Sequence, residues 1–504
     1  MPKPKAAGSA VKSRNQCAPA SPSGMAVTPG GCAATGPGHQ GVTHENACSR
    51  RRLMGMAAAA WAGIHYVPAR VLGRGGRGSP NGKLQLAGVG VGGVGFSQLE
   101  EFEKVGFQIV ALCDVDEAYA RGAFDRWPQA RRYRDFREML RTEGDRVDAV
   151  HVATPDHTHA VATLAALRAR KHVCCVKPLT RTVHECRFVV DAARKAGVAT
   201  QVTAAPNTSE LACRTCELIW AGAIGAVREV HAWSSRPLWP QGMLRPAGQD
   251  PIPKTLDWNL WIGPAPVRPF KDKWSEGDLA VAQIAAIHGG SPQSRGVYHP
   301  WNFRGWWDFG TGALGDMGCH HLNTVFRALK LKYPTAIQAT ATRCFEETAP
   351  LASIVALDYP ARETMPPVRI IWYDGGIKPP APRELEGQPL PEEGVLYVGD
   401  AGKLLGPRIL LASRAAQFEN TPRTLPRRGG TWQEWFEACR GGEPAGCNFE
   451  WAGPLTETVL LGNIAIRTGK RLVWDGERGQ FINPKQAGNY LSEPYHNGWS
   501  LEGG

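Results

Sequence analysis

Short apolar runs alternate with segments of helical periodicity over residues 84–203. Apolar runs bounded by turn-forming residues favour buried strands, and apolar positions three and four apart favour helices. The pattern predicts strands at 84–89, 108–113, 149–152, 172–176 and 199–203. It predicts helices at 96–105, 116–127, 133–141, 160–170 and 183–195. Strands that alternate with helices in this way indicate a doubly wound α/β unit with a parallel sheet.

Beyond residue 205 the apolar pattern changes to a period of two, which is typical of an antiparallel sheet. Strands are predicted at 227–234, 335–345, 352–359, 367–373, 395–398 and 403–405, and helices at 209–221, 431–440 and 451–468. A region rich in Trp and Pro contains a loop-like insertion, 273–297, to which no element is assigned. The predicted fold class is therefore a doubly wound domain over 84–205, followed over 206–504 by an α/β domain with a large, mainly antiparallel open sheet.

The segment before residue 84 differs in composition from the rest of the chain. Residues 1–48 are rich in Pro, Gly, Ala and Ser, which predicts a disordered basic tail. Residues 1–83 carry eleven Lys and Arg residues and one acidic residue, a net +10 of the total of +12. The remainder is close to neutral at +2. Neither this charge nor any zinc-finger, RNP or helix-turn-helix motif supports binding to nucleic acid.

A basic cluster followed by an apolar run lies at 49–64. Arg50, Arg51 and Arg52 precede about a dozen mainly apolar residues, fewer than the roughly 20 needed to span a bilayer. This arrangement predicts a twin-arginine secretory signal and linker over 49–80. The alternative interpretation is an ordinary basic helix start. A functional signal implies an exported protein, periplasmic or membrane-tethered; without one the protein is expected in the cytoplasm.

A glycine-rich turn follows the first predicted strand, in the sequence LAGVGVGGVG. Gly88, Gly90 and Gly93 stand at GxGxxG spacing, and Gly92 lies in the same turn. In such turns the first glycine allows a tight bend, the second lets the backbone approach a pyrophosphate, and the third lets the helix pack close to the strand. The free N–H groups of the helix N-terminus favour phosphate. In its α/β context, the turn predicts a dinucleotide-binding Rossmann domain.

Further polar groups follow the predicted strands, at the edge where open α/β sheets bind ligands. Asp114 lies 21 residues after Gly93. A carboxylate there accepts hydrogen bonds from the adenosine ribose and repels the 2′-phosphate of NADP, so NAD is favoured over NADP. Thr154, Pro155, His157 and His159 follow strand 149–152 and are predicted to bind the cofactor. Asp156 with the two histidines also has the ligand types of a metal site.

The thirteen cysteines show no disulfide-scaffold spacing. Cys213 and Cys216 form a single CxxC without a second ligand pair, which disfavours zinc. Cys174 and Cys175 lie beside an apolar run and are interpreted as packing residues.

Several blocks of sequence, in order, resemble one family of enzymes. They are GVGVGGVG (88–95), ATPDHTHA (153–160), KHVCCVKPLT (171–180), AGAIGAVREVH (221–231), WNLWIGPAP (258–266) and GWWDFGTGALGDMGCHH (305–321). With these blocks the chain from Leu84 onward is similar to the Gfo/Idh/MocA oxidoreductases, in particular to exported members with a twin-arginine signal.

The resemblance implies roles for particular residues. Lys177 matches the lysine of the family's Glu-Lys-Pro motif, near the nicotinamide and the substrate hydroxyl, and Pro178 follows it in a constrained turn; both are expected to bind the cofactor. Asp316 and His320 match the D-x-x-x-H signature, and on a helix they point the same way. We expect Lys177, Asp316 and His320 to be catalytic, with a neutral imidazole accepting the hydroxyl proton. The family uses NAD and no metal, and Val176 replaces its glutamate, which leaves the orientation of the lysine open.

The residues just before the D-x-x-x-H segment are predicted to bind the substrate: Tyr298, His299, Asn302, Arg304 and Trp306. Trp301, Trp306 and Trp307 suit stacking on the C–H faces of a sugar, or alternatively packing in a core.

Three functions remain open from the sequence. The first is an NAD-dependent dehydrogenase that acts on a sugar, cyclitol or derivative. The second is a glycosidase or lyase of the same fold, with a tightly bound NAD that is oxidised and reduced in each cycle; export favours it, because free NAD is scarce outside the cytosol. The third is a non-catalytic sugar-binding protein. We also expect a homo-oligomer formed through the open sheet.

Overall fold

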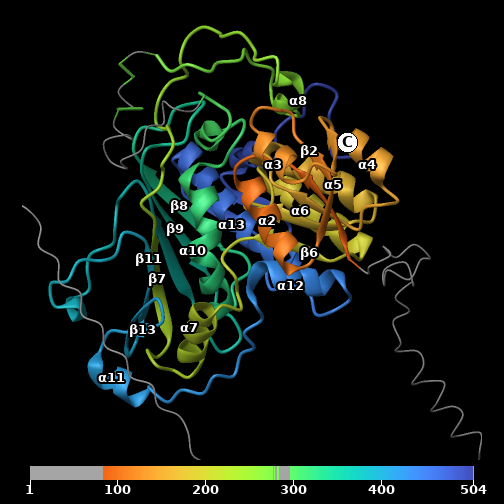
Figure 1. The fold of residues 1–504 in the computed structure, drawn as a ribbon. Helices are drawn as coiled ribbons and strands as arrows, with labels where there is room; N and C mark the ends of the chain where they lie inside the picture. Colours follow the sequence, from red (N-terminus) through yellow and green to blue (C-terminus); the bar gives the residue numbers. More distant parts are fainter. Residues whose placement is uncertain (1–82, 276, 279–280, 283–295, 503–504) are drawn as a thin grey trace, which may run out of the picture. The chain divides into compact units, whose positions relative to one another are not determined.

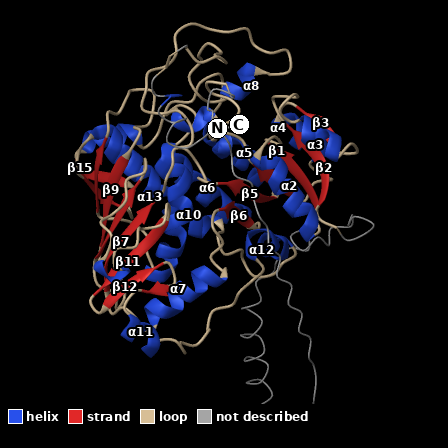
Figure 2. Cartoon of the chain, turned by 60° about the vertical axis from the view of Figure 1, so that its left-hand side comes forward, coloured by secondary structure: helices blue, strands red, loops and turns tan. Residues whose placement is uncertain are grey.

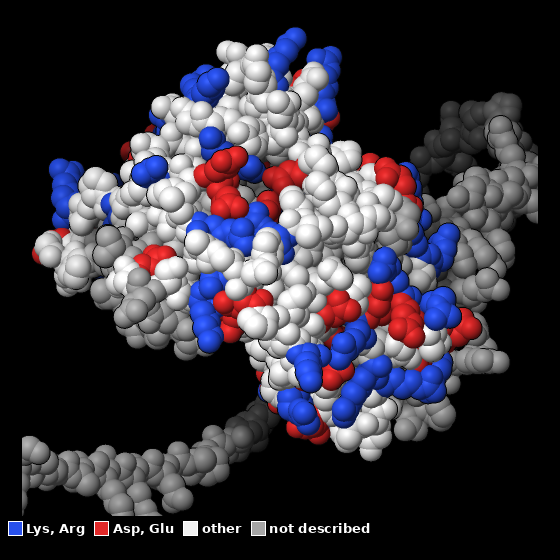
Figure 3. All heavy atoms as spheres, turned by 90° about the horizontal axis from the view of Figure 1, so that it is seen from above, with Lys and Arg blue, Asp and Glu red and all other residues white. Residues whose placement is uncertain are grey.

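The computed structural model describes residues 83–275, 277–278, 281–282 and 296–502. The predicted basic tail, the predicted signal and most of the 273–297 insertion lie outside these residues. Among the helices described, none is long and apolar enough to cross a membrane. On the face drawn in Figure 3, acidic and basic side chains intermingle, in keeping with the near-neutral charge after residue 83.

A six-stranded parallel sheet forms the first half of the described chain (Figure 1), in the order β3-β2-β1-β4-β5-β6. Its strands are β1 (Gln85–Val89), β2 (Gln108–Cys113), β3 (Arg131–Tyr133), β4 (Ala149–Val152), β5 (His172–Val176) and β6 (Thr200–Thr203). The strands predicted at 108–113, 149–152 and 172–176 are confirmed to the residue. Only β3 escaped prediction, because its Arg-Arg-Tyr sequence is mostly exposed and has no apolar pattern.

Helices cover both faces of this sheet. They are α2 (Val94–Val105), α3 (Arg121–Arg126), α4 (Phe136–Glu143), α5 (Asp156–Arg168) and α6 (Val183–Ala196). The apolar residues of α4, α5 and α6 form one core cluster, and those of α2 and α3 form a second on the other face. Apolar side chains buried on both faces explain why the strands read as continuous apolar runs.

The second half of the chain forms a nine-stranded sheet in the order β13-β12-β11-β7-β10-β9-β8-β14-β15. Its neighbours pair antiparallel except β7 and β10, which are parallel. The strands are β7 (Val227–Trp233), β8 (Ala336–Ala341), β9 (Ser353–Tyr359), β10 (Val368–Tyr373), β11 (Gly394–Gly399), β12 (Gly402–Leu405), β13 (Arg408–Ile409), β14 (Leu472–Asp475) and β15 (Gln480–Asn483). The predicted fold class, with its large and mainly antiparallel second sheet, is confirmed.

Three long helices pack on one face of the nine-stranded sheet: α7 (Glu210–Trp220), α10 (Gly312–Leu329) and α13 (Phe449–Thr468). Figure 2 shows α10 and α13 between this sheet and the parallel one. Helix α13 also packs against α6, so it joins the two halves. The smaller elements are α8 (Trp258–Ile262), α11 (Ala412–Gln417), α12 (Gly430–Cys439), η2 (Asn302–Gly305), η3 (Arg383–Leu385) and η4 (Lys485–Tyr490).

Helix α12 packs on the Rossmann half although it lies beyond residue 205, where the sequence predicts that this domain ends. Its Trp435 is fully buried against Phe102 and Phe107, with ring centroids 5.0 Å apart in both cases. Just after this helix, the Cys447 carbonyl accepts a hydrogen bond from the Val202 N–H on edge strand β6, at 2.8 Å. The Rossmann half is therefore completed by residues far along the chain.

Candidate functional site

The glycine turn lies at the carboxyl end of β1. Gly90 has φ +77°, and a Cβ on it would lie 2.7 Å from the Ala153 carbonyl carbon. A Cβ on Gly95, in the first turn of α2, would lie 1.9 Å from the Gly90 carbonyl oxygen. These are the roles of the first and third glycines of a dinucleotide turn. The geometry therefore favours the overlapping frame Gly90, Gly92 and Gly95, in place of the predicted Gly88, Gly90 and Gly93.

Gly88 and Gly93 belong to the predicted frame but not to the frame that the geometry favours. Gly88 lies within β1, where a Cβ would meet the side chains of Val91 and Leu99 at 2.8 and 2.9 Å. Gly93, with φ +49°, is the N-cap of α2, and no side chain caps that helix. The first N–H groups of α2 are thus free of side-chain acceptors, which suits an anionic diphosphate.

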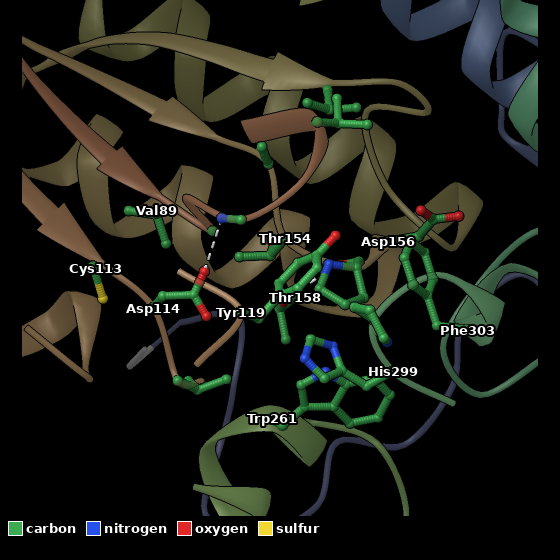
Figure 4. A pocket seen from close by; sticks show the side chains of 18 of the residues that line it. Val89, Cys113, Asp114, Tyr119, Thr154, Asp156, Thr158, Trp261, His299 and Phe303 are labelled. Atoms are coloured by element: carbon green, nitrogen blue, oxygen red, sulfur yellow. Dashed lines mark hydrogen bonds between the residues drawn. The ribbon is translucent and has the colours of Figure 1, made fainter. Parts of the chain in front are cut away.

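Asp114 follows β2 and accepts three backbone hydrogen bonds. Its Oδ2 accepts from the N–H groups of Val91 and Gly92 at 2.8 and 3.2 Å, and its Oδ1 accepts from Asp116 at 3.0 Å. Figure 4 draws the bond between Asp114 and the glycine turn. The carboxylate thereby fixes the turn at the position where the sequence predicts the ribose contact. Burial raises the pKa of Asp114 while these N–H groups oppose the rise.

A cleft runs from the glycine turn to Lys177. Its lining includes Gly90, Gly92, Asp114, Thr154, Pro155 and Val176 from the Rossmann half, and Trp261, His299 and Arg304 from the second half. Figure 4 shows the rings of Tyr119, His299 and Trp261 gathered in this cleft. Tyr119 covers the glycine turn closely, because a Cβ on Gly92 would lie 2.2 Å from its ring. His299 approaches Asp116 with Nε2 3.1 Å from Oδ2.

Two orphaned polar atoms in the cleft indicate that it is built for a ligand. The Thr154 hydroxyl and the Trp261 indole N–H are buried and have no hydrogen-bond partner among the described residues. Both side chains line the cleft. Buried polar groups in proteins normally have a hydrogen-bond partner. A polar cofactor could accept a hydrogen bond from the Trp261 indole and could either donate to or accept from the Thr154 hydroxyl. With the glycine cradle and Asp114, the cleft fits a dinucleotide.

His157 and His159 lie in the first turn of α5. The sequence predicts that they contact the cofactor, but the structure directs both side chains elsewhere. Neither imidazole lines the cleft, and both are fully buried. Each bridges two backbone carbonyls: His157 reaches Trp261 and Phe309 at 2.9 and 3.3 Å, and His159 reaches Thr154 and Pro178 at 2.8 Å each. They hold together the loops around the cleft.

The two histidines differ in charge. Burial lowers the pKa of His157 to about 3, so its imidazole is neutral. Burial opposes the charged form of His159 as well, but the Cys175 sulfur, the Asp156 carboxylate and the Pro178 carbonyl outweigh it and raise its pKa to about 9. The imidazolium of His159 donates an N–H to each of its two carbonyls, whereas the neutral His157 has one N–H, for which the Trp261 carbonyl at 2.9 Å is the nearer acceptor.

Lys177, Asp316 and Arg304 form one ionic cluster. The Lys177 ammonium donates to Asp316 Oδ1, and Arg304 Nε lies 3.1 Å from the same oxygen. Burial disfavours the Asp316 carboxylate, but the two cations outweigh it and lower its pKa. Lys177 and Arg304 line the cleft, at the end opposite Asp114 and the glycine turn. Lysine thus has an acidic partner in this chain although Val176 replaces the family's glutamate.

His320 lies one turn after Asp316 on α10. Burial and the Lys177 charge lower the pKa of its imidazole to about 4, although Asp316 opposes the shift. His320 is therefore neutral at physiological pH. It does not line the cofactor cleft but a second cavity of about 330 Å³. The helix thus places Asp316 against Lys177, which lines the cleft, and His320 at the second cavity.

The residues predicted to bind substrate separate into two groups. His299 and Arg304 line the cleft. Tyr298, Asn302 and Trp306 are fully buried away from it. The Trp306 indole donates to the Val297 carbonyl at 2.9 Å, and the Tyr298 ring packs 5.0 Å from the Trp306 ring. For Trp306 the structure therefore supports the core interpretation, because its apolar neighbours hold it inside.

Within the described residues, no group of three or more His, Cys, Asp or Glu could hold a metal ion. Cys174, Cys175, Cys213 and Cys216 are free and buried, as packing residues. Sequence reasoning missed Gly95, Tyr119 and Trp261. The overlapping GxGxxG frame was a visible signal for Gly95, whereas nothing in the sequence pointed to the two aromatic residues.

A family model described as an oxidoreductase family with an NAD-binding Rossmann fold, Gfo/Idh/MocA, matches residues 84–204. Among curated proteins, inositol 2-dehydrogenase of Salmonella typhimurium is 32% identical over 117 residues, 23% of this chain and 34% of that relative. The 1,5-anhydro-D-fructose reductase of Ensifer adhaerens is 56% identical over 52 residues, 10% of this chain and 16% of that relative. The chain thus matches about a third of the length of the inositol 2-dehydrogenases.

Among solved structures, the WlbA dehydrogenase from Bordetella pertussis, in complex with NADH and UDP-GlcNAcA, is similar with a TM-score of 0.53. The superposition covers 78% of this chain and 99% of that one at 15% sequence identity. At this identity the likeness shows the fold, which extends beyond the Rossmann half to the nine-stranded sheet.

Proposed function

We propose that this chain is a member of the Gfo/Idh/MocA family of NAD-binding oxidoreductases, whose model matches residues 84–204, and that it oxidises a secondary alcohol of a sugar, cyclitol or derivative with NAD. The observation that carries the proposal is the ionic cluster of Lys177, Asp316 and Arg304 at one end of the cofactor cleft. It places one ammonium group in the cleft, and a neutral imidazole follows one helical turn away.

The residues of the chain divide the work between binding and proton transfer. The glycine turn and Asp114 would hold the diphosphate and the adenosine ribose, and NAD, when bound, accepts the hydride. The Lys177 ammonium donates a hydrogen bond to the reacting oxygen and stabilises negative charge there. Asp316 pairs with the Lys177 ammonium and so fixes its position beside the cleft. His320 is neutral and accepts the hydroxyl proton, directly or through a water.

The test is a screen of purified protein with NAD and a set of sugars and cyclitols, following NADH by absorbance. A substrate that yields NADH with wild type, and with Lys177→Ala at a rate about 10²- to 10⁴-fold lower, supports the proposal. Equal turnover by Lys177→Ala rejects the assigned role. No turnover by any substrate, in a protein that binds NADH normally, rejects the function.

A second candidate is hydrolysis or elimination of a glycoside with an NAD that is regenerated in each cycle. The aromatic rings of Tyr119, His299 and Trp261 in the lining of the cleft favour it, because rings that pack on a bound cofactor slow its exchange. The predicted signal at 49–64 would also favour a regenerated NAD, since free NAD is scarce outside the cytosol. Cleavage of an aryl glycoside by protein with copurified NAD, without accumulation of NADH, distinguishes it from net oxidation.

The export itself is tested in a bacterial host with a twin-arginine pathway. Replacement of Arg51 and Arg52 by lysine should retain the protein in the cytoplasm, whereas the wild-type chain should reach the periplasmic fraction. Equal distribution of the two chains contradicts the signal.

A further inference from the structure

A second cavity lies beyond His320, between α7, α10 and β11. It has a volume of about 330 Å³ and is lined by Ala205, Pro206, Ser209, Leu211, Thr215, His320, His321, Thr324, Pro391, Glu393, Gly394, Val395, Tyr397, Leu405 and Gly406. None of these residues lines the cofactor cleft. This volume is many times that needed to hold one water, so the space admits a group of the size of a sugar ring.

One face of α10 leads from the cleft to this cavity. Asp316, His320 and Thr324 stand at successive i, i+4 positions, so their side chains point the same way. Asp316 is paired with Lys177, and His320 and Thr324 line the cavity. Lys177 is close enough to lower the pKa of the His320 imidazole, and His320 lines the cavity, so a substrate that contacts both side chains borders on the cavity.

Glu393 gives the cavity a fixed hydrogen-bond acceptor. Its Oε1 accepts from Ser234, Ser235 and Arg236 at 2.9, 3.1 and 2.9 Å. Among the described residues its Oε2 contacts only His321, at 3.5 Å. The neighbouring His321 imidazole, the Ser234 hydroxyl and the Arg236 guanidinium hold the pKa of Glu393 at about 2 despite its partial burial. One oxygen of an ionised and oriented carboxylate thus remains available to a ligand.

The lining selects a neutral ligand with hydroxyl groups. Among the described residues that line the cavity, Glu393 is the one acidic side chain, and none is a Lys or Arg. A phosphate or carboxylate would therefore meet a carboxylate without a facing cation. Hydroxyl groups suit Glu393, Ser209 and Thr324, whereas Leu211, Val395 and Leu405 provide apolar surface for C–H faces. His321 Nε2, 3.5 Å from Glu393 Oε2, adds a further polar atom to the lining.

We infer that the substrate is a neutral glycoside, with the reacting ring between Lys177 and His320 and its second ring in the cavity against Glu393. The inference rests on the proposed function for the position of the reacting ring. It commits to a two-ring molecule, as opposed to a free monosaccharide, a sugar acid or a sugar nucleotide.

The test compares ligand affinity by calorimetry on the full chain saturated with NAD. The one-ring probes are glucose and myo-inositol, and the two-ring probes are cellobiose, maltose and the p-nitrophenyl glucosides. Glucuronic acid serves as the anionic probe. Wild type should bind at least one two-ring probe about tenfold more tightly than the one-ring probes, and glucuronic acid more weakly than glucose. Equal or weaker binding of every two-ring probe overturns the inference.

Two variants locate the second ring. Thr324→Phe fills the cavity and should lower the ratio of two-ring to one-ring affinity about tenfold; Glu393→Gln, a smaller change, should lower it about three- to tenfold. Thr340→Phe, at an exposed position of β8, and Glu384→Gln, whose partner is Lys403, are the matched controls and should leave the ratio unchanged. An unchanged ratio in folded Glu393→Gln and Thr324→Phe places the second ring elsewhere.

The readouts separate failure of the inference from failure of the proposed function. Binding does not require turnover, so a two-ring preference without NADH formation or bond cleavage rejects the function and supports the cavity. Turnover of one-ring substrates alone, without any two-ring binding, rejects the cavity and supports the function.

Discussion

The Lys177 ammonium and the Asp316 carboxylate form an ion pair between residues 139 positions apart in the sequence, with side chains only 12% and 11% exposed. Lys177 leaves the end of β5 in the Rossmann half, and Asp316 lies on α10 of the second half. The position of the Lys177 ammonium therefore depends on how the two halves are placed relative to each other. Because Arg304 shares the same carboxylate oxygen, loss of Asp316 leaves two buried cations together.

Asp316→Asn should lower kcat about 10²- to 10³-fold and leave NADH affinity within about threefold, because the amide cannot balance Lys177 and Arg304 but the cofactor turn is remote. Stopped-flow or steady-state turnover and NADH fluorescence titration measure the two effects. The control is Asp358→Asn, which removes a half-exposed carboxylate paired with Arg369. Equal losses in kcat and in NADH affinity would instead indicate general unfolding of the cleft.

The buried histidines should make stability fall at both ends of the pH range. His151 and His157 have a pKa of about 3 in the folded chain against 6.5 for the free group, so the unfolded chain binds protons first as the pH falls. Their contribution is complete above about pH 6.5 and is lost towards pH 3. His159 has the opposite sign: with a pKa raised to about 9, its contribution is complete below about pH 6.5 and lost as the pH rises through 9.

Urea unfolding between about pH 5 and pH 10 measures both limbs. His159→Gln should flatten the alkaline limb and leave the acid limb in place, whereas His157→Gln should flatten the acid limb. A wild-type stability that is constant over this range would contradict the assigned charges.

Gly95→Ala should reduce NADH affinity more than tenfold and lower the free energy of unfolding by about 1–3 kcal/mol, because the new Cβ would meet the Gly90 carbonyl oxygen at 1.9 Å. Gly122→Ala, in helix α3, is the control: nothing lies within 4 Å of its Cβ, and helix propensity favours alanine. Thermal unfolding and NADH titration compare the two. If Gly88→Ala weakened NADH binding and Gly95→Ala did not, the originally predicted glycine frame would be restored.

Asp114→Ser should weaken NADH binding and narrow the preference for NAD over NADP. The serine hydroxyl cannot accept the three N–H groups that Asp114 accepts, and its neutral oxygen does not repel a 2′-phosphate. Dissociation constants for NADH and NADPH, measured by fluorescence, give the ratio. An unchanged ratio would place the adenosine ribose away from Asp114.

Trp435→Ala should lower the free energy of unfolding by about 3–5 kcal/mol, because this fully buried indole packs on Phe102 and Phe107. Trp220→Ala, where the indole is 42% exposed, should cost less than half as much. Urea unfolding followed by far-UV circular dichroism compares them. Similar small losses in both variants would show that α12 contributes little to the Rossmann half.

The elements predicted correctly from the sequence are those with a strong local pattern. Strands β2, β4 and β5 are apolar on both faces and stand between clear breaks, so their bounds follow from composition alone. The short strands β3, β13 and β15 carry few apolar residues, and they exist because a neighbouring strand supplies their hydrogen bonds. Pairing of that kind leaves no local trace in the sequence.

The candidate site was predicted in part for a similar reason. Residues set by backbone constraints, such as Gly90 and Asp114, stand in motifs with fixed spacing. The surroundings of Tyr298 and Trp306 depend on which side of a loop faces the core, and both face inward. Likewise His157 and His159 stand where a ligand contact is expected. Both imidazoles instead lie within hydrogen-bonding distance of backbone carbonyls that are distant in sequence, those of Trp261, Phe309 and Pro178. Long-range contacts of this sort are not encoded in spacing.

The late position of α12 and of the residues around Cys447 has a consequence for biosynthesis. On the ribosome, all six strands of the nucleotide-binding sheet emerge before the indole that fills one of its cores and before the segment that pairs with its edge strand. The nascent chain must therefore hold an incomplete nucleotide domain, with β6 uncovered, while more than two hundred further residues are synthesised. A fragment that stops at residue 205 therefore lacks the parts that finish the domain.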